Sequence, residues 1–179
     1  MGQVPIYYAQ KYSGKPATEA TYVHMDDIPV RSPQTSLGMA ATHLDTHFSP
    51  LFPFGFGLSY TQFHYQNLEI SSKTLHLGET LTIKVLLTNT GKIEGEEVVQ
   101  LYIRDLVGSV TRPVKELKDF KRVKLAAGES DCITFDLCTD KLAFYDRNMQ
   151  LNIEAGQFHL WVGGCSQTGL RDEFEIIDD

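Results

Sequence analysis

Two pairs of adjacent acidic residues are the first places where this sequence could do chemistry. They are Asp26-Asp27 and Glu96-Glu97. Paired carboxylates can cleave a glycosidic bond when they stand roughly 5 to 9 Å apart on opposite sides of that bond. Neighbours on an extended chain point to opposite sides of the strand instead. We therefore predict no catalytic residue at either pair.

His43, Asp45 and His47 alternate along the chain and could present three metal ligands on one side of a strand. A fourth ligand at a familiar spacing is missing. We interpret the segment as polar, irregular chain whose histidines face solvent or a neighbouring domain. No metal site is predicted here.

Three cysteines and a glycine-rich turn do not indicate a disulfide, a metal site or a phosphate-binding loop. Cys132 and Cys138 are separated by about 20 Å on a strand, too far for a disulfide, and with Cys165 they make an odd count without CxxC spacing. Gly55-Phe56-Gly57 has no preceding strand or following helix to make a phosphate loop, so it predicts a tight aromatic turn. We expect no bound cofactor.

Trp161 is the most informative single residue. Strand alternation places it on the face opposite Phe158, Leu160 and Val162, so its ring points outward and needs a cover. The cover could be a sugar ring stacked on an aromatic platform, with Tyr102 or Tyr145 as a companion. Packing against the N-terminal segment or another domain is the commoner case. We take Trp161 and Tyr102 as candidate domain-interface or sugar-platform residues.

The distribution of proline divides the chain into two parts. Six of the seven prolines lie in the first 53 residues. Proline fixes φ and removes a hydrogen-bond donor, so this region cannot form long helices or central strands. We predict that residues 1–52 are an extended linker or tail and that residues 53–179 form the folded domain.

An apolar period of two begins at Phe63 and continues to the end of the chain, with turn signals between the runs and no helical period. This pattern predicts an all-β, two-sheet antiparallel sandwich of immunoglobulin or fibronectin type III character, with an irregular N-terminal extension. A closed barrel is the alternative. The predicted core residues are Leu81, Ile83, Val85, Val99, Leu101, Ile103, Ile133, Phe135, Phe158 and Leu160.

Composition narrows the possible functions. The chain has 179 residues, of which 42% are hydrophobic and 22% charged, with 23 acidic against 16 basic residues and a net charge of −7. This length is short of the roughly 250 residues of a (β/α)₈ barrel. The acidic excess argues against nucleic acid as a partner. The sequence has neither a membrane-length apolar run nor a signal peptide within it, so no membrane partner is predicted.

The segment Phe52–Thr61 reads FPFGFGLSYT and closely resembles the FPFGYGLSYT signature that introduces the C-terminal fibronectin type III-like domain of family 3 glycoside hydrolases, chiefly β-glucosidases. Further motifs of that domain follow in the same order. They are Val99–Asp105, Ser109–Leu117, Ala127–Glu129, Leu142–Asp146 and Glu154–Gly163. Upstream, Gly2–Tyr8, Gly14–Thr18 and His43–Asp45 resemble the segment that leaves the family's α/β domain.

The resemblance implies a parent enzyme that hydrolyses β-glucosides by a retaining route. Its nucleophile would lie on a barrel domain and its acid/base in an α/β domain, and no residue of this chain matches either motif. We expect a non-catalytic C-terminal fragment with a stabilising role, whose partners are those two domains. A periplasmic or extracellular location would fit the parent. The alternatives are a freestanding carbohydrate- or protein-binding module and a subunit that complements a separately encoded catalytic chain.

Overall fold

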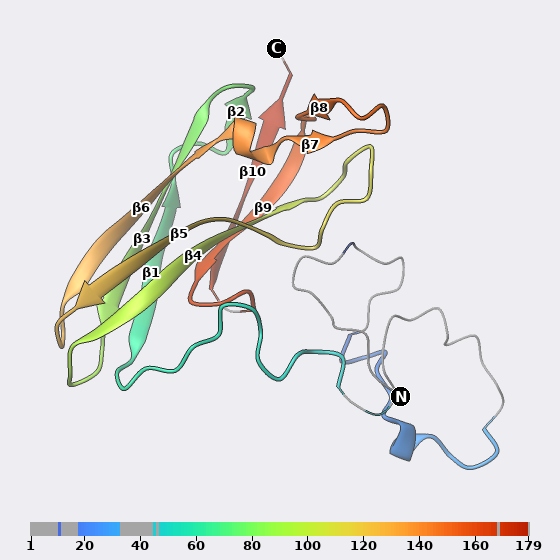
Figure 1. Ribbon diagram of the computed structural model, residues 1–179, viewed down its shortest axis with the longest axis horizontal. Helices are drawn as coiled ribbons and strands as arrows, with labels where there is room; N and C mark the ends of the chain where they lie inside the picture. Colours follow the sequence, from blue (N-terminus) through green and yellow to red (C-terminus); the bar gives the residue numbers. More distant parts are fainter. Residues whose placement is uncertain (1–10, 12–17, 33–44, 46, 168, 179) are drawn as a thin grey trace.

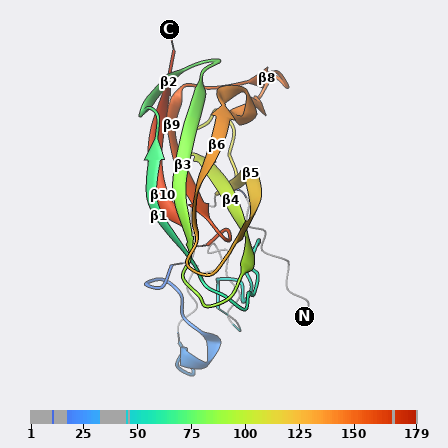
Figure 2. The same cartoon turned by 90° about the vertical axis from the view of Figure 1, so that its left-hand side faces the viewer.

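A computed structural model describes residues 11, 18–32, 45, 47–167 and 169–178. Most of these residues form a β-sandwich of two main sheets (Figure 1), which confirms the predicted fold class. Figure 2 looks onto the smaller sheet. That sheet contains, in order, β1 (Phe63–Ile70), β3 (Thr80–Asn89) and β6 (Ser130–Cys138). The larger sheet contains β2 (Thr74–His76), β10 (Leu170–Ile177), β9 (Gly156–Gly163), β4 (Gly95–Asp105) and β5 (Glu116–Leu125).

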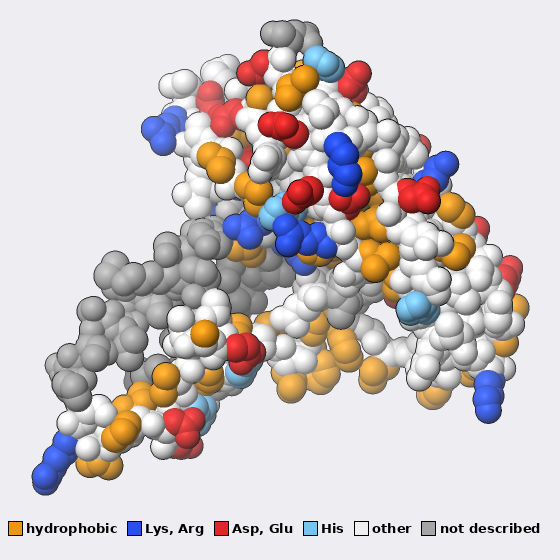
Figure 3. Space-filling view, turned by 180° about the vertical axis from the view of Figure 1, so that it is seen from behind, with side chains coloured by type: hydrophobic (Ala, Val, Ile, Leu, Met, Phe, Trp, Pro, Cys, Tyr) orange, Lys and Arg blue, Asp and Glu red, His pale blue; other side chains and the backbone are white. Residues whose placement is uncertain are grey.

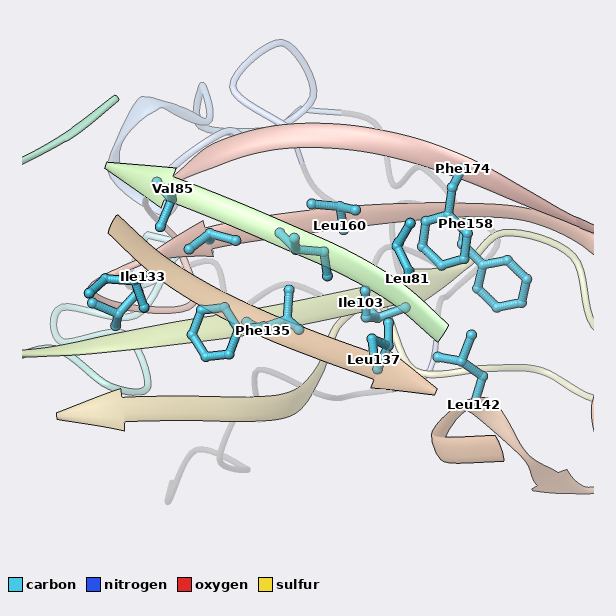
Figure 4. Close-up of a cluster of buried hydrophobic side chains, with 14 of the residues drawn as sticks. Leu81, Val85, Ile103, Ile133, Phe135, Leu137, Leu142, Phe158, Leu160 and Phe174 are labelled. Carbon is cyan, nitrogen blue, oxygen red and sulfur yellow. The ribbon is translucent and has the colours of Figure 1, made fainter. Parts of the chain in front are cut away.

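The core lies between the two sheets and is built from alternate residues of their inner faces. Figure 4 shows Phe135 and Leu137 of β6 pointing toward the same interior as Leu160 and Ile103 of the other sheet. The Phe158 and Phe174 rings stack there with centroids 5.3 Å apart. All ten predicted core residues are at most 4% exposed, so the prediction of the strand faces is confirmed.

One strand pair departs from the predicted antiparallel arrangement. β2 pairs with β10 in parallel, through Thr74, Leu75 and His76, whereas the other strand pairs are antiparallel. The chain leaves β1 in the smaller sheet and enters β2 in the larger sheet after only three residues. A strand that switches sheets in this way pairs with the edge of the second sheet that it reaches. For β2 that edge is β10, which runs in the same direction.

The remaining elements are short. Turns at Gly78 and Gly128, both with positive φ, end the strands where turn signals predicted them. A small ladder pairs β7 (Phe144–Tyr145) with β8 (Leu151–Asn152), and the 3₁₀ turns are η1 (Met25–Asp27) and η3 (Thr139–Leu142). None of the helices in the described ranges is long and apolar enough to cross a bilayer.

The described part of the N-terminal extension contains η1, several turns and an isolated bridge between Lys11 and Pro113. The upstream motifs Gly2–Tyr8, residues 14–17 and His43-Leu44 lie outside the described residues. The division of the chain at residue 52 therefore stays a prediction.

Candidate functional site

The signature segment (Phe52–Thr61) is held to the sandwich by polar contacts near its start. Phe56 N–H donates to the Pro53 carbonyl at 3.0 Å and closes the predicted turn, with Gly55 at φ +79°. Ser166 N–H donates to the Phe54 carbonyl at 2.9 Å. A Cβ on Gly55 would fall on the side-chain amide of Gln100, so glycine is needed both for the positive φ and for this close approach.

The other end of the segment is anchored by a buried hydrogen-bond network. Thr61 Oγ1 donates to Asn89 Oδ1 at 2.6 Å, and Gly91 N–H donates to the same oxygen at 3.1 Å. The Asn89 amide donates in turn to the carbonyls of Ile93 and Leu125, at 2.8 and 3.1 Å. Asn89 has no exposed surface, and each of its side-chain polar atoms is paired. The segment therefore has a fixed path at both ends.

The large apolar side chains of the signature segment point away from the core. Every second residue of the segment is a large apolar residue that is 45 to 99% exposed. Figure 3 shows hydrophobic side chains gathered along the connection between the sandwich and the N-terminal part. A contiguous exposed apolar surface of this kind usually marks an interaction site. The exposed residues are Phe52, Phe54, Phe56, Leu58 and Tyr60.

A hollow lies between this segment and the adjacent end of the larger sheet. We call it the Glu97 hollow; its lining is Gly55–Ser59, Glu96–Val98, Gly164 and Cys165. Glu97 accepts a hydrogen bond from Tyr65 Oη at 2.9 Å. Burial raises the pKa of Glu97, and the hydrogen bond from Tyr65 opposes that shift. Burial and the Glu97 charge also raise the pKa of Tyr65.

The two acids of the Glu96-Glu97 pair have different partners. Glu96 forms an exposed ion pair with Arg122 on β5, while Glu97 bonds to Tyr65 on β1. The two carboxylates therefore turn to different strands; the absence of a catalytic role at this pair stays a prediction.

Trp161 and Tyr102 are neighbours across β4 and β9. Trp161 is half-buried, and the Lys115 ammonium lies 4.2 Å from its ring centroid. Tyr102 lies on the face predicted to point outward, but it has no exposed surface. The residues after β4 fold back over it: Lys115 Nζ is 5.6 Å from its ring, and its hydroxyl donates to Gln100. Trp161 is therefore the member of the pair that a sugar or another domain could reach.

Lys115 connects these aromatic rings to the signature segment. Its ammonium donates to the Ser166 carbonyl at 2.5 Å, and Ser166 N–H donates to Phe54. Burial lowers the pKa of Lys115 to about 8. Lys115, Ser166 and Gln100 were not singled out from the sequence, because nothing local shows that residues so far apart in the chain meet.

The histidine cluster does not come together as a metal site in the described part of the chain. His43 lies outside the described residues. His47 faces Glu19, with Nε2 and Oε1 3.3 Å apart, and its Nδ1 lies 2.6 Å from Ser49 Oγ. Among the described residues, no three His, Cys, Asp or Glu side chains are placed to hold a metal ion.

A family model described as "Fibronectin type III-like domain" matches residues 97–166. The periplasmic beta-glucosidase of Salmonella typhimurium is 33% identical over 177 residues, which are 99% of this chain and 21% of that protein. A beta-xylosidase of Formosa agariphila is 44% identical over 119 residues, 66% of this chain and 16% of its own length. The crystal structure of beta-glucosidase from Listeria innocua superposes with a TM-score of 0.81 at 33% identity, over 98% of this chain and 22% of that one. The chain thus spans 16 to 22% of the length of these relatives.

Proposed function

We propose that this chain, which carries a fibronectin type III-like domain, is a part of a family 3 glycoside hydrolase of the β-glucosidase kind and has a structural, non-catalytic role there. The comparisons bear out the resemblance that the ordered motifs predicted, since a fibronectin type III-like domain and β-glucosidases are among the matches. The chain acts as the stabilising sandwich of a longer enzyme that hydrolyses O-glycosyl bonds of β-glucosides. Its partners are the barrel and α/β domains of that enzyme.

One observation carries the proposal: the signature segment is anchored at both ends and yet exposes five large apolar side chains. A segment whose apolar side chains had no further partner would gain by folding them onto the sandwich. The anchors at Gly55 and Thr61 prevent that movement. The segment is therefore shaped to bury these side chains against another part of a longer chain.

Trp161 supports an interface more than a sugar platform. A stacked sugar needs a free ring face, and two cations already lie over the indole: the Lys115 ammonium 4.2 Å and the Arg171 guanidinium carbon 5.9 Å from a ring centroid. Trp161, Tyr102 and Lys115 then act as the support beneath the signature segment, through Ser166.

A chimera tests the proposal. The fifth of the Salmonella β-glucosidase that matches this chain is removed, or is replaced by this chain. We expect the shortened enzyme to be less soluble and to melt at a lower temperature, and the chimera to regain both properties together with turnover of an aryl β-glucoside. A shortened enzyme that keeps its melting temperature and turnover would overturn the stabilising role.

The isolated chain supplies the second test. It should release no aryl product above background, because retaining hydrolysis needs a nucleophile and an acid/base facing one pocket. Saturable turnover that survives repurification and disappears when an acid of this chain is mutated would contradict the proposal.

Limited proteolysis tests the division at residue 52. Cleavage should concentrate before Leu51, while the stretch from about Leu58 to Ile177 survives. Equal resistance along the whole chain would show that the extension is part of the folded domain.

A further inference from the structure

Glu97 is a half-buried carboxylate that lacks a cationic partner in the described part of the chain. Its hydrogen bond comes from a neutral donor, the Tyr65 hydroxyl. The cation Arg122 is paired with the adjacent Glu96 and not with Glu97. Partial burial of an uncompensated charge is costly, and the raised pKa of Glu97 has that burial as its main cause.

The surroundings of Glu97 are those of a receptor for a long cationic side chain. The hollow is walled on one side by the signature segment, including Phe56 and Leu58, and on the other by the end of the larger sheet. The Phe56 ring lies against that of Phe52, with centroids 5.4 Å apart. An aromatic wall beside a carboxylate suits a guanidinium group, which can stack on a ring and pair with the carboxylate at the same time.

Space at the carboxylate is maintained by a glycine. A Cβ on Gly164 would come within 2.6 Å of Glu97 Oε1 and 3.4 Å of the Tyr65 hydroxyl. The hollow would therefore be partly filled by any larger residue at that position.

We propose that the Glu97 hollow binds an arginine side chain from the catalytic part of the parent enzyme, with the guanidinium paired to Glu97 and stacked beside Phe56. This rests on the proposed function. The chain spans about a fifth of the length of its relatives, so most of the parent surface that could supply the arginine lies outside these 179 residues. Charge complementarity selects a cation, and the apolar wall selects one with a long stem.

The test uses the full chain and two probes of equal shape. N-acetylarginine methylamide and its neutral isostere N-acetylcitrulline methylamide are titrated separately, and backbone amide shifts are followed by NMR. We expect the arginine probe to shift the amides of Gly55, Gly57 and Gly164, and to bind at least about fivefold more tightly than the citrulline probe. Equal affinities, shifts confined to other surfaces or no shifts at all would overturn the proposal.

Two variants show whether the carboxylate is responsible. Glu97→Gln keeps an acceptor for the Tyr65 hydroxyl but removes the charge, and should abolish the preference for the arginine probe. Glu175→Gln, at an exposed position on β10, should leave the preference unchanged. In the isolated chain Glu97→Gln should not lower the melting temperature, since it removes a poorly solvated charge; a fall there with unchanged probe binding would assign Glu97 a purely structural role and refute the proposal.

The chimera separates this inference from the stabilising role. If Glu97→Arg leaves the chimera as stable as the unmodified chimera, the arginine site is wrong while the stabilising role stands. If the shortened enzyme keeps its melting temperature and turnover without this chain, the stabilising role itself is refuted.

Discussion

The interior of the sandwich and the signature segment are both rich in large apolar residues, but they place them in opposite ways. In the interior, alternate side chains such as Val85 and Phe135 face each other between two sheets and are almost completely buried. In the signature segment, alternate side chains such as Phe52 and Leu58 face outward, and polar contacts hold the backbone. The interior stabilises this chain by itself, whereas the segment is built to be completed by another surface.

The largest difference between the two regions should appear on truncation of single side chains. Phe135→Ala should destabilise the isolated chain by about 3 to 5 kcal/mol, through lost burial and the cavity left behind. Leu58→Ala should change stability by no more than about 0.5 kcal/mol, because the side chain is already in water. Urea unfolding of both variants measures this. Similar losses at the two positions would show that the segment folds onto the sandwich in solution.

The turn at the start of the signature segment gives the next largest effect. Gly55→Ala should cost about 1 to 3 kcal/mol, because alanine is strained at a positive φ and its Cβ meets Gln100. Gly57→Ala is the matched control, since a Cβ there meets nothing within 4 Å. It should be neutral or stabilise by up to about 1 kcal/mol. If the two variants melt at the same temperature, the segment is not held at Gly55.

The anchor at Thr61, at the far end of the signature segment, should contribute less to the stability of the chain. Thr61→Val keeps the shape of the side chain but removes the hydroxyl that donates to Asn89, and should cost about 1 kcal/mol. The loss is limited because Asn89 Oδ1 still accepts from Gly91 N–H. Thr88→Val removes an exposed hydroxyl contact with Ser130 and serves as the control, with a smaller expected loss. A greater loss at Thr88 than at Thr61 would show that the buried network is not the anchor.

The same contrast explains what could be predicted from the sequence. The core strands were predictable because a strand buried on one face has an apolar residue at every second position of its sequence. β5 was not, since it is an edge strand with charged residues on both faces, such as Lys121 and Arg122. β2 is only three residues long, too short for a periodic pattern.

The candidate site could be predicted only in part. Gly55 and Trp161 were recognised because turn geometry and strand parity are local properties. The burial of Tyr102 was not, because its cover comes from Lys115 in the following loop. The Glu97 hollow joins residues more than thirty positions apart, Tyr65 and Glu97 among them, and nothing in their immediate neighbours indicates that they meet.

The remaining expected effect is a dependence of stability on pH through Lys115. Its pKa is about 8 in the folded chain, below the 10.5 of an exposed lysine, because burial disfavours the ammonium form. Between these two values the unfolded chain binds more protons than the folded chain, so the free energy of unfolding should rise as the pH increases from about 8 toward 10.5. The ammonium also attracts the Trp161 ring, which favours the charged form and reduces the slope. Lys115→Met should flatten this rise, measured by urea unfolding at several pH values, whereas Lys141→Met, on a largely exposed lysine paired with Asp119, should retain it. A rise that persists unchanged in Lys115→Met would mean that another group titrates, and that the support beneath the signature segment does not depend on the protonation of Lys115.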